Sequence, residues 1–202
     1  MQSDKKDEVD PLANIDFNAP KARKRSLEDL AKVLDAELIE KEWFVTGKVN
    51  PIYFDDNFQF QDPDVKLTGI EEYARGVLKL FDQSTSRAQI ISSVVNTTIP
   101  DTITVTWRLS GDVNIGPGLP IKPYICYTDF TVDNESGLIT FQEDRFDVPG
   151  WDILLSALFP FLIGKITKAA APEVEPRVVE MPKAAVSGEG GIFDGLIKFF
   201  GA

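Results

Sequence analysis

The sequence contains no histidine and one cysteine, Cys126, among its 202 residues. Without histidine, the commonest metal ligand and the commonest general base are both absent. A zinc site, a Ser-His-Asp triad and a Cys-His pair are therefore excluded in their usual forms. A single cysteine forms no internal disulfide, and its apolar strand context predicts a small buried side chain. We expect no metal and no cofactor. Because histidine is absent, any acid–base chemistry must use Asp, Glu, Tyr, Lys or water.

Positive charge is also scarce, because 21 Lys and Arg residues stand against 32 Asp and Glu residues, a net charge of -11. An acidic surface repels phosphate backbones, which excludes nucleic acid as an expected partner. The one basic run, residues 21–25, is typical of a solvated leader, with a contact to a partner or to anionic lipid as the alternative. Long apolar runs are missing too, and Trp151–Ile163 is shorter than the roughly 20 residues that span a bilayer.

The first half of the chain predicts two helices on either side of an aromatic segment. Residues 1–25 are polar and read as a flexible leader without a secretory signal. Ser26 is expected to start a helix that runs to about Phe44, with Leu30 and Leu38 among its one-sided apolar residues. Residues 52–60 predict a helical turn and a short strand. A capping box at Thr68 then predicts a helix to about residue 82.

The second half predicts antiparallel strands, followed by a helix and a tail. Strands are expected over residues 87–98, 102–109, 124–132 and 138–146, with a long loop at 111–123 and a hairpin turn at 133–137. The apolar stretch Trp151–Ile163 predicts a helix that packs on the sheet or caps it. The alternative is an interfacial membrane segment or a partner-binding surface. Residues 169–191 read as a linker, and residues 192–202 as an amphipathic peptide that docks on the domain or elsewhere.

Several short motifs occur in an order that resembles a known superfamily. They are Phe60-Gln61-Asp62-Pro63, the helix start Thr68-Gly69-Ile70-Glu71-Glu72-Tyr73, the strand Thr106-Trp107-Arg108-Leu109-Ser110-Gly111, the hairpin Gly137-Leu138-Ile139, and Trp151-Asp152. Together they resemble the NTF2-like (SnoaL-like) superfamily, and more narrowly the DUF2358-type proteins of plants and algae. The resemblance covers residues 26–164 or so, within an expected domain of 26–168.

The resemblance implies an α+β cone, with N-terminal helices packed on a strongly curved antiparallel sheet around an apolar pocket. For the narrow family it implies a photosynthetic organism and a plastid location, soluble or peripheral to the thylakoid. The wider superfamily includes isomerases, cyclases, dehydratases and epoxide hydrolases beside many non-catalytic modules. The absence of histidine argues against chemistry of the His-Asp dehydratase type.

Two carboxylates are candidate catalytic bases, Asp62 and Asp144. A carboxylate in an apolar cone has its pKa raised toward neutrality. The alternative for Asp62 is a turn role before Pro63. Asp144 and Arg145 lie on one strand and point to opposite faces, so one of them points into the cone as a base or as a carboxylate-binding cation. The alternative for both is an ion pair or a solvated face.

The expected ligand-binding side chains are mostly aromatic, and the alternative for them is an ordinary core. They are Tyr53, Phe60, Tyr73, Trp107, Tyr124 and Tyr127, together with Arg145. The expected partner-binding side chains are Trp151, Phe159, Phe193, Leu196, Phe199 and Phe200. The aromatic residues of the ligand-binding set would line a pocket, and the phenols among them would donate a hydrogen bond to an oxyanion.

Three functions follow from these patterns. The first is a pocket module that binds a small apolar ligand or a protein partner. The second is an isomerase, cyclase or lyase that uses an Asp base. The third is a peripheral subunit of a photosynthetic membrane complex, attached through its C-terminal segments. The chain is expected to be a monomer or a dimer.

Overall fold

The computed structural model of the protein describes residues 10–177. The helical elements are α1 (Leu27–Lys41), α2 (Trp43–Thr46), α3 (Ile70–Leu80) and α4 (Gly150–Leu158), with 3-10 turns η1 (Pro51–Tyr53) and η2 (Pro160–Leu162). The strands are β1 (Phe54–Gln61), β2 (Lys66–Thr68), β3 (Arg87–Val95), β4 (Thr102–Val113), β5 (Leu119–Val132) and β6 (Ile139–Phe146).

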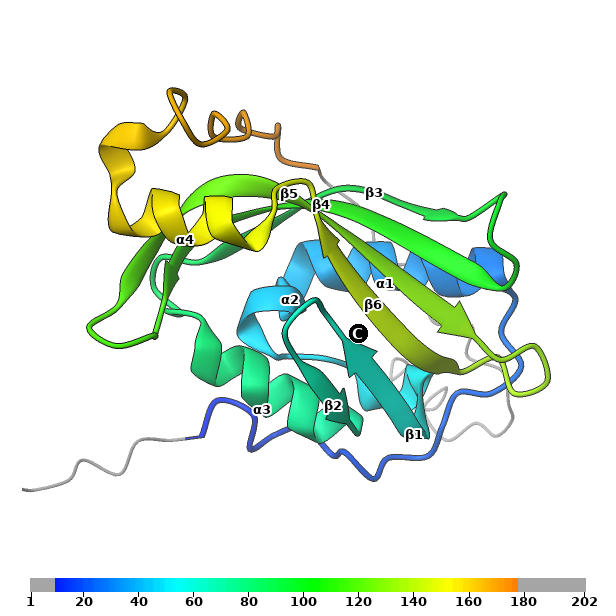
Figure 1. Cartoon of the computed structure of the whole chain (residues 1–202). Coiled ribbons are helices and arrows are strands. Elements are labelled where there is room, and N and C mark those ends of the chain that lie inside the picture. Colours follow the sequence, from blue (N-terminus) through cyan, green and yellow to red (C-terminus); the bar gives the residue numbers. More distant parts are fainter. Residues whose placement is uncertain (1–9, 178–202) are drawn as a thin grey trace, which may run out of the picture.

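The six strands form one sheet in the order β2-β1-β6-β5-β4-β3. Figure 1 shows this sheet curving over α1, α2 and α3, so the predicted α+β fold is confirmed. One pair departs from the expected antiparallel pattern, because β1 and β6 run parallel. Strands β3 to β6 form an antiparallel meander that begins at the edge strand β3 and runs back toward β1. Its last strand, β6, lies beside β1 and runs in the same direction as β1.

The first helix begins as predicted but ends earlier. The Ser26 hydroxyl accepts a hydrogen bond from the backbone N–H of Asp29 at 3.1 Å, which caps α1. The predicted continuation to Phe44 is interrupted at Glu42, whose φ of 46° lies in the left-handed region. The Glu42 carboxylate accepts a hydrogen bond from the backbone N–H of Ala88 at 3.0 Å. This tertiary contact to β3 stabilises a break that the helical periodicity does not reveal.

The predicted capping box at Thr68 is wrong. Thr68 belongs to β2, which pairs with β1, and the N-cap of α3 is Gly69 with φ 91°. The backbone N–H of Gly69 donates to the carbonyl oxygen of Phe58 at 2.7 Å. A side chain other than glycine is strained at this φ, so the glycine allows the chain to turn directly from strand to helix.

The loop predicted over residues 111–123 is mostly strand. Strands β4 and β5 stay paired out to Val113 and Leu119, which leaves only residues 114–118 as a loop. A register shift next to Gly111 permits this, since Gly111 has φ 120° and an added Cβ would lie 2.3 Å from the Cα of Ser86. Glycine here marks a bulge within a long strand rather than the end of the strand.

Residues 10–25 were expected to be a flexible leader, and the structure instead packs them on the domain. Leu12 is fully buried in the core. The backbone N–H of Ala22 donates to the Ile52 carbonyl at 2.9 Å, and that of Lys24 donates to the Ser136 carbonyl at 2.7 Å. One buried leucine and two long-range backbone bonds hold a segment that looks polar in sequence. Residues 1–9 lie outside the described part.

Aromatic side chains from helices and sheet meet in one core beneath the sheet. The rings of Trp43 and Phe44 on α2 lie 4.5 Å apart, and Phe44 stacks on Trp107 of β4 at 4.7 Å. Phe54 contacts Phe58 at 5.0 Å with the rings nearly perpendicular. Offset and edge-to-face contacts of this kind add to the free energy gained from burial. Cys126 is buried, as predicted.

The C-terminal part of the described chain lies over the sheet. The apolar stretch predicted as a helix forms α4, which contacts β5 at one end of the molecule (Figure 1) and ends before Pro160. Residues 169–177 were expected to belong to a linker, but the backbone N–H of Ala171 donates to the Pro123 carbonyl and Arg177 makes two hydrogen bonds to Asp35. Among residues 10–177 no helix is long and apolar enough to cross a membrane.

Candidate functional site

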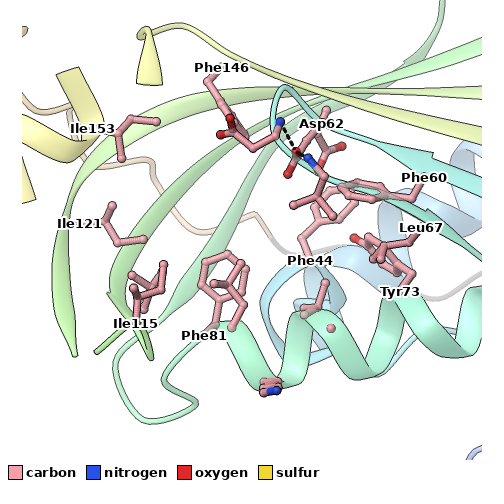
Figure 2. A pocket seen from close by; sticks show the side chains of 18 of the residues that line it. Phe44, Phe60, Asp62, Leu67, Tyr73, Phe81, Ile115, Ile121, Phe146 and Ile153 are labelled. Carbon is pink, nitrogen blue, oxygen red and sulfur yellow. Dashed lines mark hydrogen bonds between the residues drawn. The ribbon is translucent and has the colours of Figure 1, made fainter. Parts of the chain in front are cut away.

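A cavity of about 560 Å³ opens between α3, the sheet and α4. Its lining is mainly apolar, and Figure 2 shows Phe60, Tyr73 and Leu67 on one side and Ile121 and Ile153 on the other. The apolar lining residues are Phe44, Phe60, Val65, Leu67, Val77, Leu80, Phe81, Trp107, Val113, Ile115, Ile121, Phe146 and Ile153. The polar ones include Asp62, Asp64, Tyr73, Asn114, Tyr124 and Asp144. A volume of this size falls within the range of small-molecule sites.

Asp144 brings a carboxylate to this apolar cavity from the middle of β6. Side chains alternate along a strand, so Gln142 and Asp144 share the inner face, and Arg145 lies on the outer one. The Oδ1 atom of Asp144 accepts hydrogen bonds from the Thr128 hydroxyl at 2.7 Å and from Nε2 of Gln142 at 3.1 Å. Within residues 10–177, no hydrogen bond involves Oδ2, which leaves that oxygen available to a molecule in the cavity.

The partners of Asp144 are themselves held by further hydrogen bonds. The indole Nε1 of Trp107 donates to the Thr128 hydroxyl oxygen at 3.0 Å, which directs the Thr128 proton toward Asp144. Nε2 of Gln142 also donates to the Tyr73 hydroxyl at 3.2 Å. The Tyr73 oxygen is the acceptor in this bond, so the Tyr73 O–H can donate to another group. A buried, mutually supporting network of this kind fixes the orientation of the carboxylate.

Burial raises the pKa of Asp144 from an ordinary value of 3.8 to about 7. The hydrogen bonds from Thr128 and Gln142 oppose the rise, and the negative charges of Asp62 and Asp129 add to it. Burial also raises the pKa of Tyr73 and that of Tyr124, with nearby carboxylates adding to both shifts. Near neutral pH, Asp144 therefore exchanges its proton, while both phenols remain protonated hydrogen-bond donors.

Asp62, the other predicted base, lines the cavity and also stabilises a turn. Its side chain lines the cavity near the β1–β2 turn, as Figure 2 shows. Its Oδ1 accepts backbone hydrogen bonds from Asp64 at 2.8 Å and Val65 at 2.6 Å. This is the turn role that the Asp-Pro sequence predicts as an alternative. Asp62 is partly exposed, whereas Asp144 is buried.

Phe60, Tyr73, Trp107 and Tyr124 line the cavity, but three other residues predicted as ligand contacts do not. Arg145 points away from the cavity and forms an ion pair with Asp129. Tyr127, its register partner on β5, is half-buried on the same outer face. Tyr53 is buried below the guanidinium of Arg25, whose Cζ lies 5.4 Å from the ring centroid. Strand parity separates Arg145 and Tyr127 from the cavity, and the sequence alone does not say which parity faces inward. Tyr53 belongs to the turn η1, before the first strand.

Thr128 and Gln142 are site residues that the sequence patterns did not identify. Gln142 could have been found, because it lies two residues before Asp144 and so shares its face. Thr128 comes from β5, and it lies opposite Asp144 only because of the register of the β5–β6 pair. That register depends on the hairpin at residues 133–137 and on an irregularity beside Val132.

The predicted partner-binding residues lie away from the cavity or outside the described chain. Trp151 and Phe159 are exposed on α4 and just after it. Phe193, Leu196, Phe199 and Phe200 lie outside residues 10–177. No group of three or more acidic or cysteine side chains in residues 10–177 is arranged to hold a metal ion.

The fold and the site together define an α+β cone with a mainly apolar cavity, in whose wall one carboxylate, Asp144, is buried. The profile of the family described as "Uncharacterized conserved protein (DUF2358)" matches residues 28–140, more than half of the chain. The chain belongs to the DUF2358 family, which confirms the narrower resemblance drawn from the motifs. No curated protein matches the sequence.

Solved structures with a similar course of the chain are distant in sequence. An LEH-like epoxide hydrolase of M. tuberculosis is 15% identical, with a TM-score of 0.42 over 66% of this chain and 90% of its own. A protein with a ketosteroid isomerase-like fold from Catenulispora acidiphila, in complex with trimethylamine, is 13% identical, with a TM-score of 0.43 over 65% and 93%. An NTF2-like protein of unknown function from Cytophaga hutchinsonii is 16% identical, with a TM-score of 0.39 over 61% and 92%. At these values the likeness does not extend to substrate or reaction.

The raised pKa of Asp144 predicts a specific pH dependence of stability. Between its ordinary pKa of 3.8 and about 7, the folded protein keeps a proton that the unfolded chain has lost. The native protein should therefore lose stability relative to Asp144→Asn as the pH rises through this range, by up to about 4 kcal/mol. Urea unfolding of both proteins at several pH values measures the difference. Asp62→Asn is the control, and a pH-independent gap between native protein and D144N would contradict the burial of this carboxyl.

Proposed function

We propose that this protein binds a small, mostly apolar molecule in the cavity and that Asp144 meets a polar group on that molecule. The observation that carries the proposal is Asp144, a buried and half-bonded carboxylate in a mainly apolar cavity of about 560 Å³. Apolar walls supply most of the free energy of binding, and one polar group fixes the orientation of the ligand. Near pH 7 the carboxyl accepts a hydrogen bond when ionised and donates one when protonated.

A neutral apolar fluorophore, N-phenyl-1-naphthylamine, tests the cavity. Its emission should rise when it enters the native protein. Val77→Trp places a large ring in the cavity wall and should weaken binding by about tenfold or more. Val94→Trp is the matched control, because Val94 is exposed on β3 and does not line the cavity. Equal fluorophore binding by the native protein and V77W would contradict the cavity as the binding site.

A second candidate function is proton transfer, catalysed by Asp144 as in an isomerase, cyclase or lyase. A pKa of about 7 favours it, because a general base works best near the operating pH. In an isomerisation, Oδ2 would remove a proton from the carbon next to a carbonyl group and return it to a more distant carbon. The phenols of Tyr73 and Tyr124 would stabilise the enolate oxygen by donating hydrogen bonds. At the end of the cycle the proton is on the product and the Asp144 carboxylate has regained its negative charge.

A panel of β,γ-unsaturated ketones in D₂O tests this second candidate. The native protein should speed both isomerisation and deuterium uptake, and Asp144→Asn should slow them on the order of 10²–10⁴-fold. Asp62→Asn should retain most of the rate, because Asp62 serves the β1–β2 turn. Fluorophore binding by D144N separates loss of chemistry from loss of the cavity. Native protein that is no faster than buffer with any of these ketones would remove the candidate.

We also propose a plastid location, with a peripheral position on a photosynthetic membrane complex as the alternative role. Membership of the DUF2358 family supports the location, since the family resemblance implies plants and algae. The exposed Trp151 and Phe159 support a contact to a partner. An antibody against the chain should detect it in isolated plastids, and a mild detergent should release it from their membranes, because the exposed contact residues are apolar. Detection only outside plastids would contradict the location.

A further inference from the structure

Helix α4 carries its polar side chains on the inside and its apolar side chains on the outside. Asp152 and Ser156, one turn apart, have exposed fractions of only 1% and 2%. Trp151, Leu154 and Leu158 have exposed fractions of 59%, 57% and 51%. A surface helix of a globular protein normally shows the opposite arrangement. These three exposed apolar side chains of α4 therefore do not serve the packing of the domain, whereas Ile153 does.

The inner side of α4 is held by polar bonds instead. The Asp152 carboxylate forms a buried ion pair with Lys122 on β5 and accepts a hydrogen bond from the backbone N–H of Lys168 at 2.7 Å. Lys122 also donates to the carbonyl oxygen of Lys168 at 2.8 Å. These bonds close the segment 149–168 at its base. Together with the partly buried Ile153, these bonds fix the helix on the domain without its exposed apolar side chains.

The apolar exposure continues beyond the helix. Phe159 and Phe161 contact each other edge to face at 6.1 Å, and Ile166 follows. We call the surface formed by the following six exposed residues the α4–η2 surface: Trp151, Leu154, Leu158, Phe159, Phe161 and Ile166. Between residues 149 and 164 the only charged side chain is Asp152, and it is buried. The nearest exposed charge along the chain on the C-terminal side is Lys165, which is positive in a chain of net charge -11. Lys168 follows and forms an ion pair with Asp147 at 3.7 Å.

We propose that the α4–η2 surface seats the protein on a lipid bilayer, at the boundary between headgroups and acyl chains. A protein interface of useful size carries about one hydrogen bond per 100–200 Å². Among the exposed side chains of residues 149–164, only the Trp151 indole offers a hydrogen-bonding group. A lipid boundary needs no such groups, and it favours Trp, Phe and Leu with flanking lysines.

This position would also serve the cavity. Ile153 of α4 lines the cavity from one side of the helix, while Leu154 belongs to the α4–η2 surface. Ile115, which also lines the cavity (Figure 2), is itself exposed. An apolar molecule could then pass from the bilayer into the cavity with little exposure to water. This last step rests on the proposed function, whereas the bilayer contact rests on the α4–η2 surface alone.

The test uses the full chain with vesicles of phosphatidylcholine and phosphatidylglycerol in equal parts. Trp43 and Trp107 are buried, so Trp151 is the one exposed tryptophan. Vesicles should shift its emission to shorter wavelength, and brominated acyl chains should quench it. Each apolar anchor contributes about tenfold, so Leu154→Ser with Phe161→Ser should weaken vesicle binding on the order of a hundredfold. Ile91→Ser with Val94→Ser is the matched control, because both residues are exposed on β3.

Three outcomes would overturn the proposal. The first is native protein whose tryptophan emission is unchanged by vesicles. The second is an L154S/F161S variant that binds vesicles as well as the native chain does, since another part of the chain then makes the contact. The third is a native dimer that ignores vesicles and becomes monomeric in L154S/F161S, which would assign the surface to a second copy. Fluorophore binding in the cavity is measured separately, so failure of the bilayer contact and failure of the proposed function are distinguishable.

Discussion

Burial of the Asp144 carboxyl in an apolar cavity is the interaction on which the site depends. An isolated charge in such a place is unfavourable, so the carboxyl requires hydrogen-bond donors and holds its proton up to a pKa of about 7. Thr128 and Gln142 supply the donors, and Trp107 and Tyr73 orient those two side chains. Each of these residues comes from an element packed around the cavity. The chemistry available to the protein is therefore tied to the curvature and register of its sheet.

Asp152, another of the buried carboxylates, has a different role. Its ion pair with Lys122 joins α4 to the sheet and turns the apolar side of the helix outward. Removing one partner of such a pair leaves an uncompensated buried charge, whereas the exposed leucines and phenylalanines contribute little to folding. The same contact thus explains why α4 is well anchored and why its outer surface remains available. Asp144 thus places a carboxyl in the cavity, whereas Asp152 holds a helix on the sheet.

The sequence patterns predicted the elements well where periodicity and local caps decide the outcome. The Ser26 cap, the apolar stretch of α4 and the strands from β3 to β6 are examples. The patterns were wrong where a distant contact overrides a local signal. Glu42 breaks a helix because its carboxylate binds β3, Thr68 joins β2 because that strand pairs with β1, and residues 10–25 are held by Leu12 and by backbone bonds.

By itself, the sequence determined that histidine chemistry is excluded, that the fold is α+β, and that Asp144 and Arg145 lie on opposite faces of one strand. The first result follows from composition, the second from the order of helix and strand patterns and the family resemblance, and the third from the two-residue period of a strand. Only the tertiary structure decided that Asp144 faces the cavity and that Thr128 lies opposite it, because sheet curvature and strand register are set by contacts between distant segments. The tertiary structure also decided that α4 turns Asp152 inward, since its partner Lys122 lies on strand β5, 30 residues earlier.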